Sequence, residues 1–278
     1  MSATLSYSGP IGVFDSGYGG LTILKEIRSR LPQYDYIFLG DNARAPYGSR
    51  SFDVVYEFTL QAVRRLFELG CPLVILACNT ASAKALRSIQ QCDLPSIDPT
   101  RRVLGVIRPT VEALGDLTQT GSIGLFGTAG TVRSRSYDME VEKLYPGFRT
   151  YSQACPLWVP LIENGEAQHD GADYFVEKYV SLLFEQADDI DTVLLGCTHY
   201  PILYDKIRAA VPATAQVVCQ GGIVAESLAD YLQRHREMET RLTRGGSCRY
   251  LTTEQPEAFA ALAERFLGEP IEASHIRV

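Results

Sequence analysis

Two cysteines in this sequence stand in closely similar settings, each at the end of a short aliphatic run. The first run leads into Cys78-Asn79-Thr80 and the second into Cys197-Thr198-His199. A free thiol has a pKa of about 8.5, so modest tuning by its surroundings lets it take up or release a proton near neutral pH. Two thiols on opposite sides of one carbon atom could remove a proton from one face and deliver one to the other, which would invert the configuration of that carbon.

Each of the two cysteines has a titratable neighbour that could help it to form a thiolate. Asp15 follows the first aliphatic run of the chain, and His199 lies two residues after Cys197. The helices expected after each cysteine add partial positive charge at their N-termini. Together with nearby hydroxyl and amide side chains, these helix starts can hold a carboxylate. The side chains in question are Ser16, Asn79, Thr80, Thr128, Thr131 and Thr198. We therefore expect a small carboxylate as the ligand.

The elements that must position these residues alternate along the chain between aliphatic runs and helical patterns, which predicts an α/β fold with mainly parallel sheets. Ligands bind beyond the carboxyl ends of the strands in such sheets, and every polar cluster follows a predicted strand. The predicted strands are 11–14, 36–39, 73–77, 123–126 and 193–195. The predicted helices are 21–31, 51–69, 81–91, 137–144, 174–186 and 202–211.

The chain also resembles itself, which predicts two pseudo-symmetric α/β domains with the active site in the cleft between them. Residues 11–17 resemble 123–129, and residues 74–80 resemble 193–199 in the same order. The residues after 211 read as strand 215–219, helix 222–234, strand 248–252, helix 256–267 and a strand near Ile271, too little for a third unit. We predict a discontinuous first domain of 1–104 plus 212–278 and a second domain of 105–211. The chain is expected to cross from the first domain to the second within 95–109.

Composition excludes several classes of protein. The chain has 278 residues, of which 46% are hydrophobic, and its 26 Lys and Arg against 33 Asp and Glu give a net charge of −7. Without a basic run, this balance argues against nucleic-acid binding. No apolar stretch approaches the ~20 residues of a membrane helix, and we do not expect the first ten residues to form a signal peptide. Seven cysteines without a CxxC pair argue against a disulfide framework and a zinc site. We expect a cytoplasmic protein without a metal or a membrane partner.

Other chemistries fit the same residues less well. The glycine loop at 17–20 opens a helix after a strand, but the dinucleotide pattern fails because residue 22 is Thr, and Asp15 would repel a pyrophosphate. A hydrolase built on Cys197 and His199 would leave the setting of Cys78 unexplained. Either cysteine alone could be core filler. We expect the other five to be structural: Cys71, Cys92, Cys155, Cys219 and Cys248.

Four motifs in order resemble those of the bacterial glutamate racemases, within the aspartate/glutamate racemase superfamily. They lie at 15–22, 41–48, 77–82 and 196–201, and weaker similarity extends through 127–131 and 155–163. The resemblance implies cofactor-independent interconversion of L- and D-glutamate for peptidoglycan synthesis. It also implies two α/β domains, the first of them discontinuous, and a homodimer whose geometry stays open.

The resemblance further implies roles for individual residues. Cys78 and Cys197 match the two acid/base residues, with Cys78 serving D-glutamate and Cys197 serving L-glutamate, and Glu163 matches a position that assists the second cysteine. The positions that match substrate-binding residues are Asp15, Ser16, Tyr47, Gly48, Asn79, Thr80, Thr198 and His199. Two alternatives stay open at this point: an aspartate racemase or related two-cysteine racemase, and a non-catalytic regulator that binds glutamate or another protein.

Overall fold

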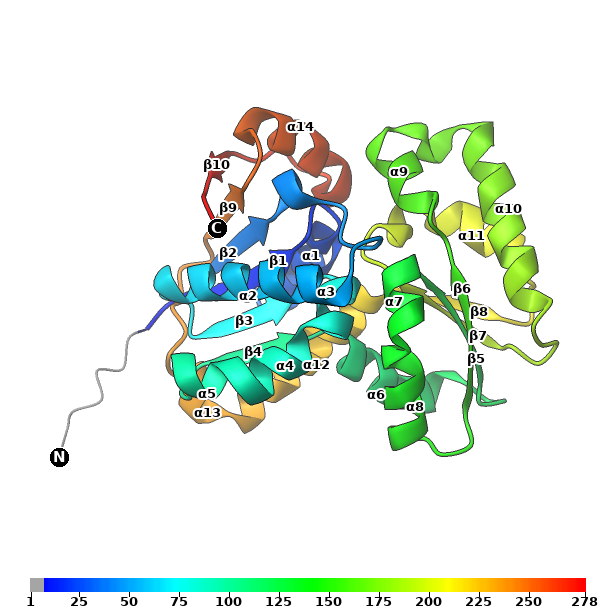
Figure 1. Ribbon diagram of the computed structural model, residues 1–278, viewed down its shortest axis with the longest axis horizontal. Coiled ribbons are helices and arrows are strands. Elements are labelled where there is room, and N and C mark those ends of the chain that lie inside the picture. Colours follow the sequence, from blue (N-terminus) through cyan, green and yellow to red (C-terminus); the bar gives the residue numbers. More distant parts are fainter. Residues whose placement is uncertain (1–7) are drawn as a thin grey trace.

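The aliphatic runs of the sequence form the central strands of two parallel sheets in the computed structural model, which describes residues 8–278 (Figure 1). The first sheet has the order β10-β9-β2-β1-β3-β4 and the second the order β6-β5-β7-β8. The strands of the first sheet are β1 (Ile11–Asp15), β2 (Tyr36–Gly40), β3 (Leu73–Leu76), β4 (Arg102–Gly105), β9 (Cys248–Thr252) and β10 (Ala273–His275). Those of the second are β5 (Ser122–Gly127), β6 (Arg149–Ala154), β7 (Thr192–Gly196) and β8 (Gln216–Val218).

The two sheets repeat one topology. The order β2-β1-β3-β4 in the first sheet corresponds to β6-β5-β7-β8 in the second, so that β1 matches β5 and β3 matches β7. All of the neighbouring strands pair in parallel, for example β1 with β3 and β5 with β7. Cys78 follows β3 and Cys197 follows β7, which places the two cysteines at equivalent positions of the two units.

The edge strands differ from what the sequence predicts. β4 and β6 were not expected, and the last strand begins at Ala273 rather than near Ile271. β8 pairs with β7 in the second sheet, whereas we assigned all residues from 212 onward to the first domain. These strands lie at sheet edges and are partly exposed, so they lack the continuous aliphatic run that identifies a strand covered on both faces. β8 corresponds to β4, and the second unit therefore extends past 211.

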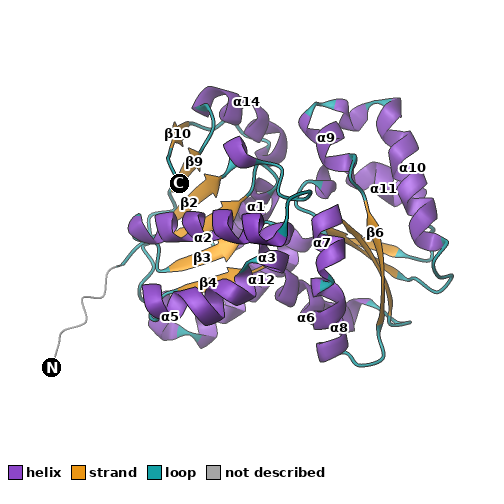
Figure 2. Cartoon of the chain, in the orientation of Figure 1, coloured by secondary structure: helices purple, strands orange, loops and turns teal. Residues whose placement is uncertain are grey.

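Helices cover both faces of each sheet (Figure 2). In the first unit, α1 (Gly20–Arg30), α12 (Gln220–Arg234) and α14 (Pro256–Leu267) pack on one face and α2 (Phe52–Glu68) on the other. In the second unit, α6 (Ile107–Leu117) and α8 (Ser136–Leu144) pack on one face, with α10 (Asp170–Phe184) and α11 (Tyr204–Ala210) on the other. The shorter helices are α3 (Asn79–Lys84), α4 (Leu86–Ser88), α5 (Leu94–Ile97), α7 (Ala129–Ser134), α9 (Trp158–Glu163) and α13 (Arg236–Glu239).

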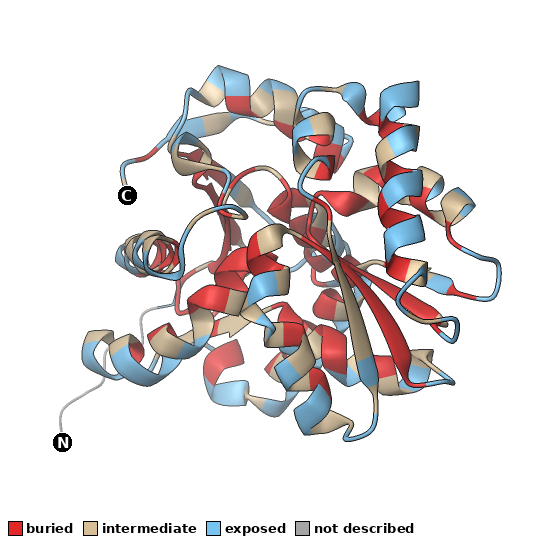
Figure 3. Cartoon of the chain, turned by 45° about the vertical axis from the view of Figure 1, so that its right-hand side comes forward, coloured by how far each residue is buried: buried red, intermediate tan, exposed pale blue. Residues whose placement is uncertain are grey.

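One apolar cluster continues from the first unit into the second. It includes Val13 and Ile75 of the first sheet and Phe126 and Trp158 of the second unit. The buried residues lie along the strands and on the helix faces turned towards them, as Figure 3 shows. This shared core fixes the two units against each other beneath the loops that carry the polar clusters. Within residues 8–278, no helix is long and apolar enough to cross a bilayer.

Candidate active site

The loops that follow β1, β3, β5 and β7 meet at one cavity of about 420 Å³ between the two units. Cys78 and Cys197 both line it. The other lining residues that the sequence predicts are Ser16, Tyr47, Gly48, Asn79, Thr80, Thr128, Glu163, Thr198 and His199. Asp15 and Thr131 were also expected in the site, and they do not line the cavity. The carboxyl ends of parallel strands thus bring residues from both halves of the chain together.

Cys78 caps the N-terminus of α3. Its sulfur accepts a hydrogen bond from the backbone N–H of Ala81 at 3.5 Å, and the Ser16 hydroxyl oxygen lies 3.4 Å from the sulfur. Burial raises the pKa of the Cys78 thiol to about 12, and the charge of Asp15 acts in the same direction. The contacts with Ser16 and Ala81 lower this pKa but do not offset burial. Burial thus favours the thiol form of Cys78 over its thiolate.

Asp15 lies behind the cavity wall and is fully buried. One of its carboxylate oxygens accepts a hydrogen bond from the backbone N–H of Gly17 at 2.9 Å. Burial raises the pKa of Asp15, while the charge of His199 lowers it. We expected Asp15 to help Cys78 to form a thiolate, but a negative charge here raises the pKa of Cys78. The catalytic role of Asp15 stays a prediction.

Cys197 stands at one end of a relay of three side chains. Its sulfur lies 3.9 Å from Nδ1 of His199, and Nε2 of His199 lies 2.9 Å from Oε1 of Glu163. Burial lowers the pKa of His199, but the contacts with Cys197 and Glu163 outweigh it and raise this pKa to about 10. The imidazole is therefore a cation at neutral pH, and it supports negative charge on the sulfur. The two thiols of the cavity thus have unlike surroundings.

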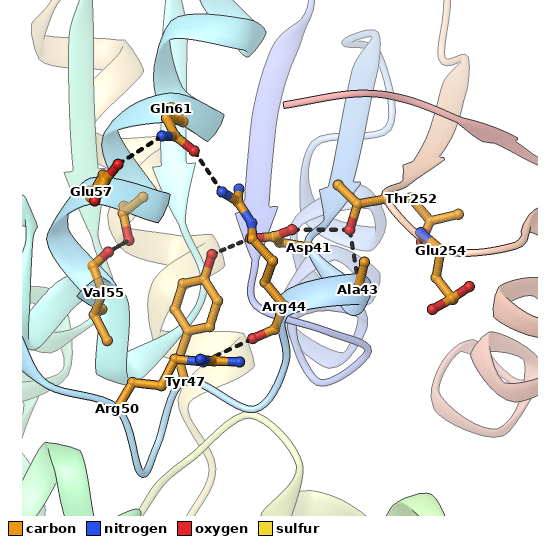
Figure 4. Close-up of polar contacts among 12 residues, drawn as sticks. Asp41, Ala43, Arg44, Tyr47, Arg50, Val55, Glu57, Gln61, Thr252 and Glu254 are labelled. Carbon is orange, nitrogen blue, oxygen red and sulfur yellow. Dashed lines mark hydrogen bonds and ion pairs between the residues drawn. The ribbon is translucent and has the colours of Figure 1, made fainter.

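The hydroxyl of Tyr47 is directed away from the cavity. It donates a hydrogen bond to the buried carboxylate of Asp41, which Arg44 also contacts, with 2.7 Å between Nε and Oδ2 (Figure 4). The hydroxyl of Thr253 donates to the other carboxylate oxygen at 2.9 Å. Asp41 thus ties the loop that carries Tyr47 and Gly48 to the end of β9. Tyr47 therefore offers the cavity its ring and backbone rather than its hydroxyl.

Three threonine hydroxyls join the two units at another wall of the cavity. Thr80 lies 2.9 Å from Thr128 and 3.3 Å from Thr131, measured between hydroxyl oxygens, and Thr128 lies 3.1 Å from Thr131. Thr128 also caps α7 by accepting the backbone N–H of Thr131 at 3.2 Å. Thr131 therefore supports Thr80 and Thr128 from behind the wall, which explains why it does not line the cavity.

The loop with Cys197 lies closely against the start of α1. The hydroxyl oxygen of Thr22 lies 2.9 Å from the carbonyl oxygens of both Gly19 and Thr198, which share its single proton. A Cβ atom at position 19 would lie 2.2 Å from Oγ1 of Thr198 and 2.4 Å from Nδ1 of His199. Only glycine leaves room for this approach, and the glycine loop thus serves packing between the two units.

Several lining residues were not predicted as part of the site. They are Gly17, Ala45, Pro46, Ser49, Ala129, Cys155, Pro156, Val159, Pro160 and Asn164. Most of them are small or apolar and carry no chemical signal in a single sequence. Cys155, which we expected to be structural only, is 1% exposed in the cavity wall, and burial raises the pKa of its thiol. The motif at 155–163 is the part of the sequence from which these wall residues could have been predicted.

The chain is similar to known proteins in both sequence and structure. The profile of the Asp/Glu/Hydantoin racemase family matches residues 21–228. The glutamate racemase of Roseobacter denitrificans is 42% identical over 274 residues, which cover 95% of this chain and 98% of that protein. The glutamate racemase isoform RacE1 of Bacillus anthracis has a similar structure, with a TM-score of 0.88, 32% identity and coverage of 97% and 98%. The glutamate racemase of Francisella tularensis, solved in complex with D-glutamate, has a TM-score of 0.84 and is 32% identical. The match covers 98% of this chain and 97% of that one.

Proposed function

This chain belongs to the Asp/Glu/Hydantoin racemase family, and from this membership we propose that it interconverts L- and D-glutamate with Cys78 and Cys197 as its two acid/base residues. The observation that carries the two-thiol mechanism is that both cysteines line one cavity, at equivalent positions of two repeated units. The similarity to curated glutamate racemases over nearly the whole chain supports glutamate as the substrate.

The proposed reaction moves one proton onto the enzyme and one proton onto the substrate. A thiolate on one side takes the α-proton, and the electron pair of the broken C–H bond passes into the adjacent carboxyl group. The thiol on the other side then gives its proton to the same carbon, and configuration is inverted. We assign Cys197 to L-glutamate and Cys78 to D-glutamate. The imidazolium of His199 stabilises the Cys197 thiolate, and Glu163 holds the imidazole in place.

The cavity can hold glutamate through hydrogen-bond donors from both units. Glutamate carries two carboxylates, and charge-assisted hydrogen bonds to such groups are roughly twice as strong as neutral ones. We propose that the donors are the side chains of Ser16, Asn79, Thr80, Thr128 and Thr198 and the backbone around Tyr47 and Gly48, all of which line the cavity. His199 lines it too, but its two ring nitrogens already face Cys197 and Glu163. Thr131 acts behind Thr80 and Thr128.

The function is tested by following the optical rotation or circular dichroism of separate L-glutamate and D-glutamate solutions with purified protein and no pyridoxal phosphate. We expect both enantiomers to be converted to an equal mixture. A parallel assay with L-aspartate should show a rate about 10–200-fold lower, because one methylene changes transition-state binding by that factor. No conversion of either glutamate enantiomer would reject the proposal. A faster reaction with aspartate than with glutamate would identify aspartate as the preferred substrate. Supply of D-glutamate for peptidoglycan synthesis, a homodimer and a cytoplasmic location remain predictions.

The contact between Glu163 and His199 predicts a pH effect. In Glu163→Gln the carboxylate charge is lost, so the pKa of His199 falls and the imidazole loses its proton at lower pH than in the wild type. The alkaline limb of the pH profile, where activity falls as His199 loses its proton, should therefore shift to lower pH. A hydrogen bond to a charged group contributes about 1.5–3 kcal/mol, so kcat/KM should fall about 10- to 100-fold.

The pH profile of kcat/KM between pH 6 and 10 measures this effect. Glu166→Gln is a matched control, because Glu166 also contacts a histidine, His169, at 2.7 Å on the exposed surface and does not line the cavity. An alkaline limb that is unchanged in Glu163→Gln would show that Glu163 does not act through His199.

A further inference from the structure

Three polar side chains that no motif of the sequence marks hold Asn79 from the side away from the cavity. They are Thr110 on α6, Tyr137 on α8 and Gln220 at the start of α12, and all four side chains are at most 2% exposed. Of these four, only Asn79 lines the cavity. The group spans both units, because α3 and α12 pack in the first unit while α6 and α8 cover the second sheet.

The hydrogen bonds of this group can run in only one direction. The hydroxyl of Thr110 donates its single proton to the carbonyl oxygen of Val106 at 2.7 Å, so its oxygen must accept from Gln220 at 2.9 Å. The nitrogen of the Gln220 amide therefore faces Thr110, and it also donates to the Tyr137 hydroxyl oxygen at 2.7 Å. A hydroxyl that accepts in this way has its own proton free to donate.

The same direction fixes the orientation of Asn79. The Tyr137 hydroxyl donates to Oδ1 of Asn79 at 2.6 Å, and Nδ2 of Asn79 donates to Oε1 of Gln220 at 2.6 Å. Nδ2 carries two protons, and Gln220 takes one of them. One N–H of Asn79 is thus left for a ligand, while the amide oxygen is held by Tyr137 and keeps only its second lone pair.

We propose that Gln220 and Tyr137 are positioning residues that lock the Asn79 amide with an N–H available to the substrate. This inference rests on the proposed function. An amide held in this way selects a carboxylate of glutamate and rejects the ammonium group, since the ammonium group can only donate hydrogen bonds. Without the lock, the amide could turn and offer the cavity either end.

Tyr137→Phe tests the lock by removing the proton donor to Asn79 while keeping the ring. We expect KM for both enantiomers of glutamate to rise about tenfold, with kcat changed less than threefold. Thr110 is two hydrogen bonds away from Asn79, so Thr110→Val should raise KM by a smaller factor, about threefold. Tyr36→Phe is the matched control, because the buried Tyr36 hydroxyl donates to the carbonyl oxygen of Leu31 at 2.7 Å, away from the cavity. It should leave both KM and kcat unchanged.

A double-mutant cycle separates positioning from general stability. In an Asn79→Ala background, Tyr137→Phe should raise KM less than twofold further, because the group it positions is gone. A full tenfold effect in that background, or an unchanged KM in the single variant, would overturn the inference. If Tyr137→Phe does not fold, the same cycle with Thr110→Val decides. The wild-type protein is assayed before any variant is made. If it does not racemise glutamate, the proposed function is rejected rather than the role of Tyr137 and Gln220.

Discussion

Replacing either Cys78 or Cys197 by serine is expected to lower the rate of glutamate racemisation about 10²–10⁴-fold, the usual contribution of a positioned acid or base. A serine hydroxyl has a far higher pKa than a thiol and cannot take the α-proton at neutral pH. The cavity keeps its shape, so D-glutamate should still bind when measured by calorimetry. Each variant retains one thiol, so in D₂O Cys78→Ser should still exchange the α-proton of L-glutamate, and Cys197→Ser that of D-glutamate.

Cys71→Ser is the control for these two variants. Cys71 is buried like the other two, does not line the cavity, and has a thiol whose pKa burial raises to about 12. It should racemise glutamate at the wild-type rate. If Cys78→Ser and Cys197→Ser both racemise normally, the two thiols are structural and the two-base mechanism is wrong.

Gly19→Ala is expected to lower kcat/KM about 100-fold or more, although residue 19 carries no chemistry. The added methyl group would lie 2.2 Å from Oγ1 of Thr198 and 2.4 Å from Nδ1 of His199, so these two side chains beside Cys197 must move. A shift of about 1 Å at a reacting group can cost about 10²-fold in rate. The relay from Glu163 through His199 to Cys197 would be disturbed at the same time.

Gly171→Ala is the matched control for this variant. Gly171 also lies at the start of a helix, α10, and an added Cβ there meets no atom within 4 Å. It should keep wild-type activity, while steady-state kinetics with both glutamate enantiomers measure the loss in Gly19→Ala. More than a tenth of the wild-type kcat/KM in Gly19→Ala would mean that the contact between the two units does not position Cys197.

The sequence predicts well the part of the fold that is buried on both sides. Runs such as 73–77 and 193–195 are aliphatic without interruption, and both form central strands. The edge strands β4, β6 and β8 carry polar or partly exposed residues, and their partners are set by contacts between distant segments. A local pattern cannot contain that information, which is why β8 was assigned to the wrong unit.

The site divides in a similar way. Cys78, Cys197 and His199 could be predicted because they have reactive side chains and follow strands at equivalent positions of the two units. The direction of a side chain could not be predicted, and the hydroxyl of Tyr47 is bound to Asp41 rather than turned to the cavity. The position of Asp15 behind the wall depends in the same way on the packing around it.

The support of Asn79 was missed for a different reason. Thr110, Tyr137 and Gln220 stand in three separate helices, and each is an ordinary residue in its own segment. Only the packing of α6, α8 and α12 around α3 brings their polar atoms into one hydrogen-bonded group. Such a group has no signature along a single sequence.

The central claim is that the sulfurs of Cys78 and Cys197 approach one carbon atom from opposite sides. A crystal structure of this protein with D-glutamate bound tests it most directly, through the distances from each sulfur to Cα of the ligand. We expect the two sulfurs on opposite faces of Cα, each about 3–3.5 Å from it, as reacting groups require. Two sulfurs on the same face, or a ligand whose Cα lies out of reach of either sulfur, would contradict the account.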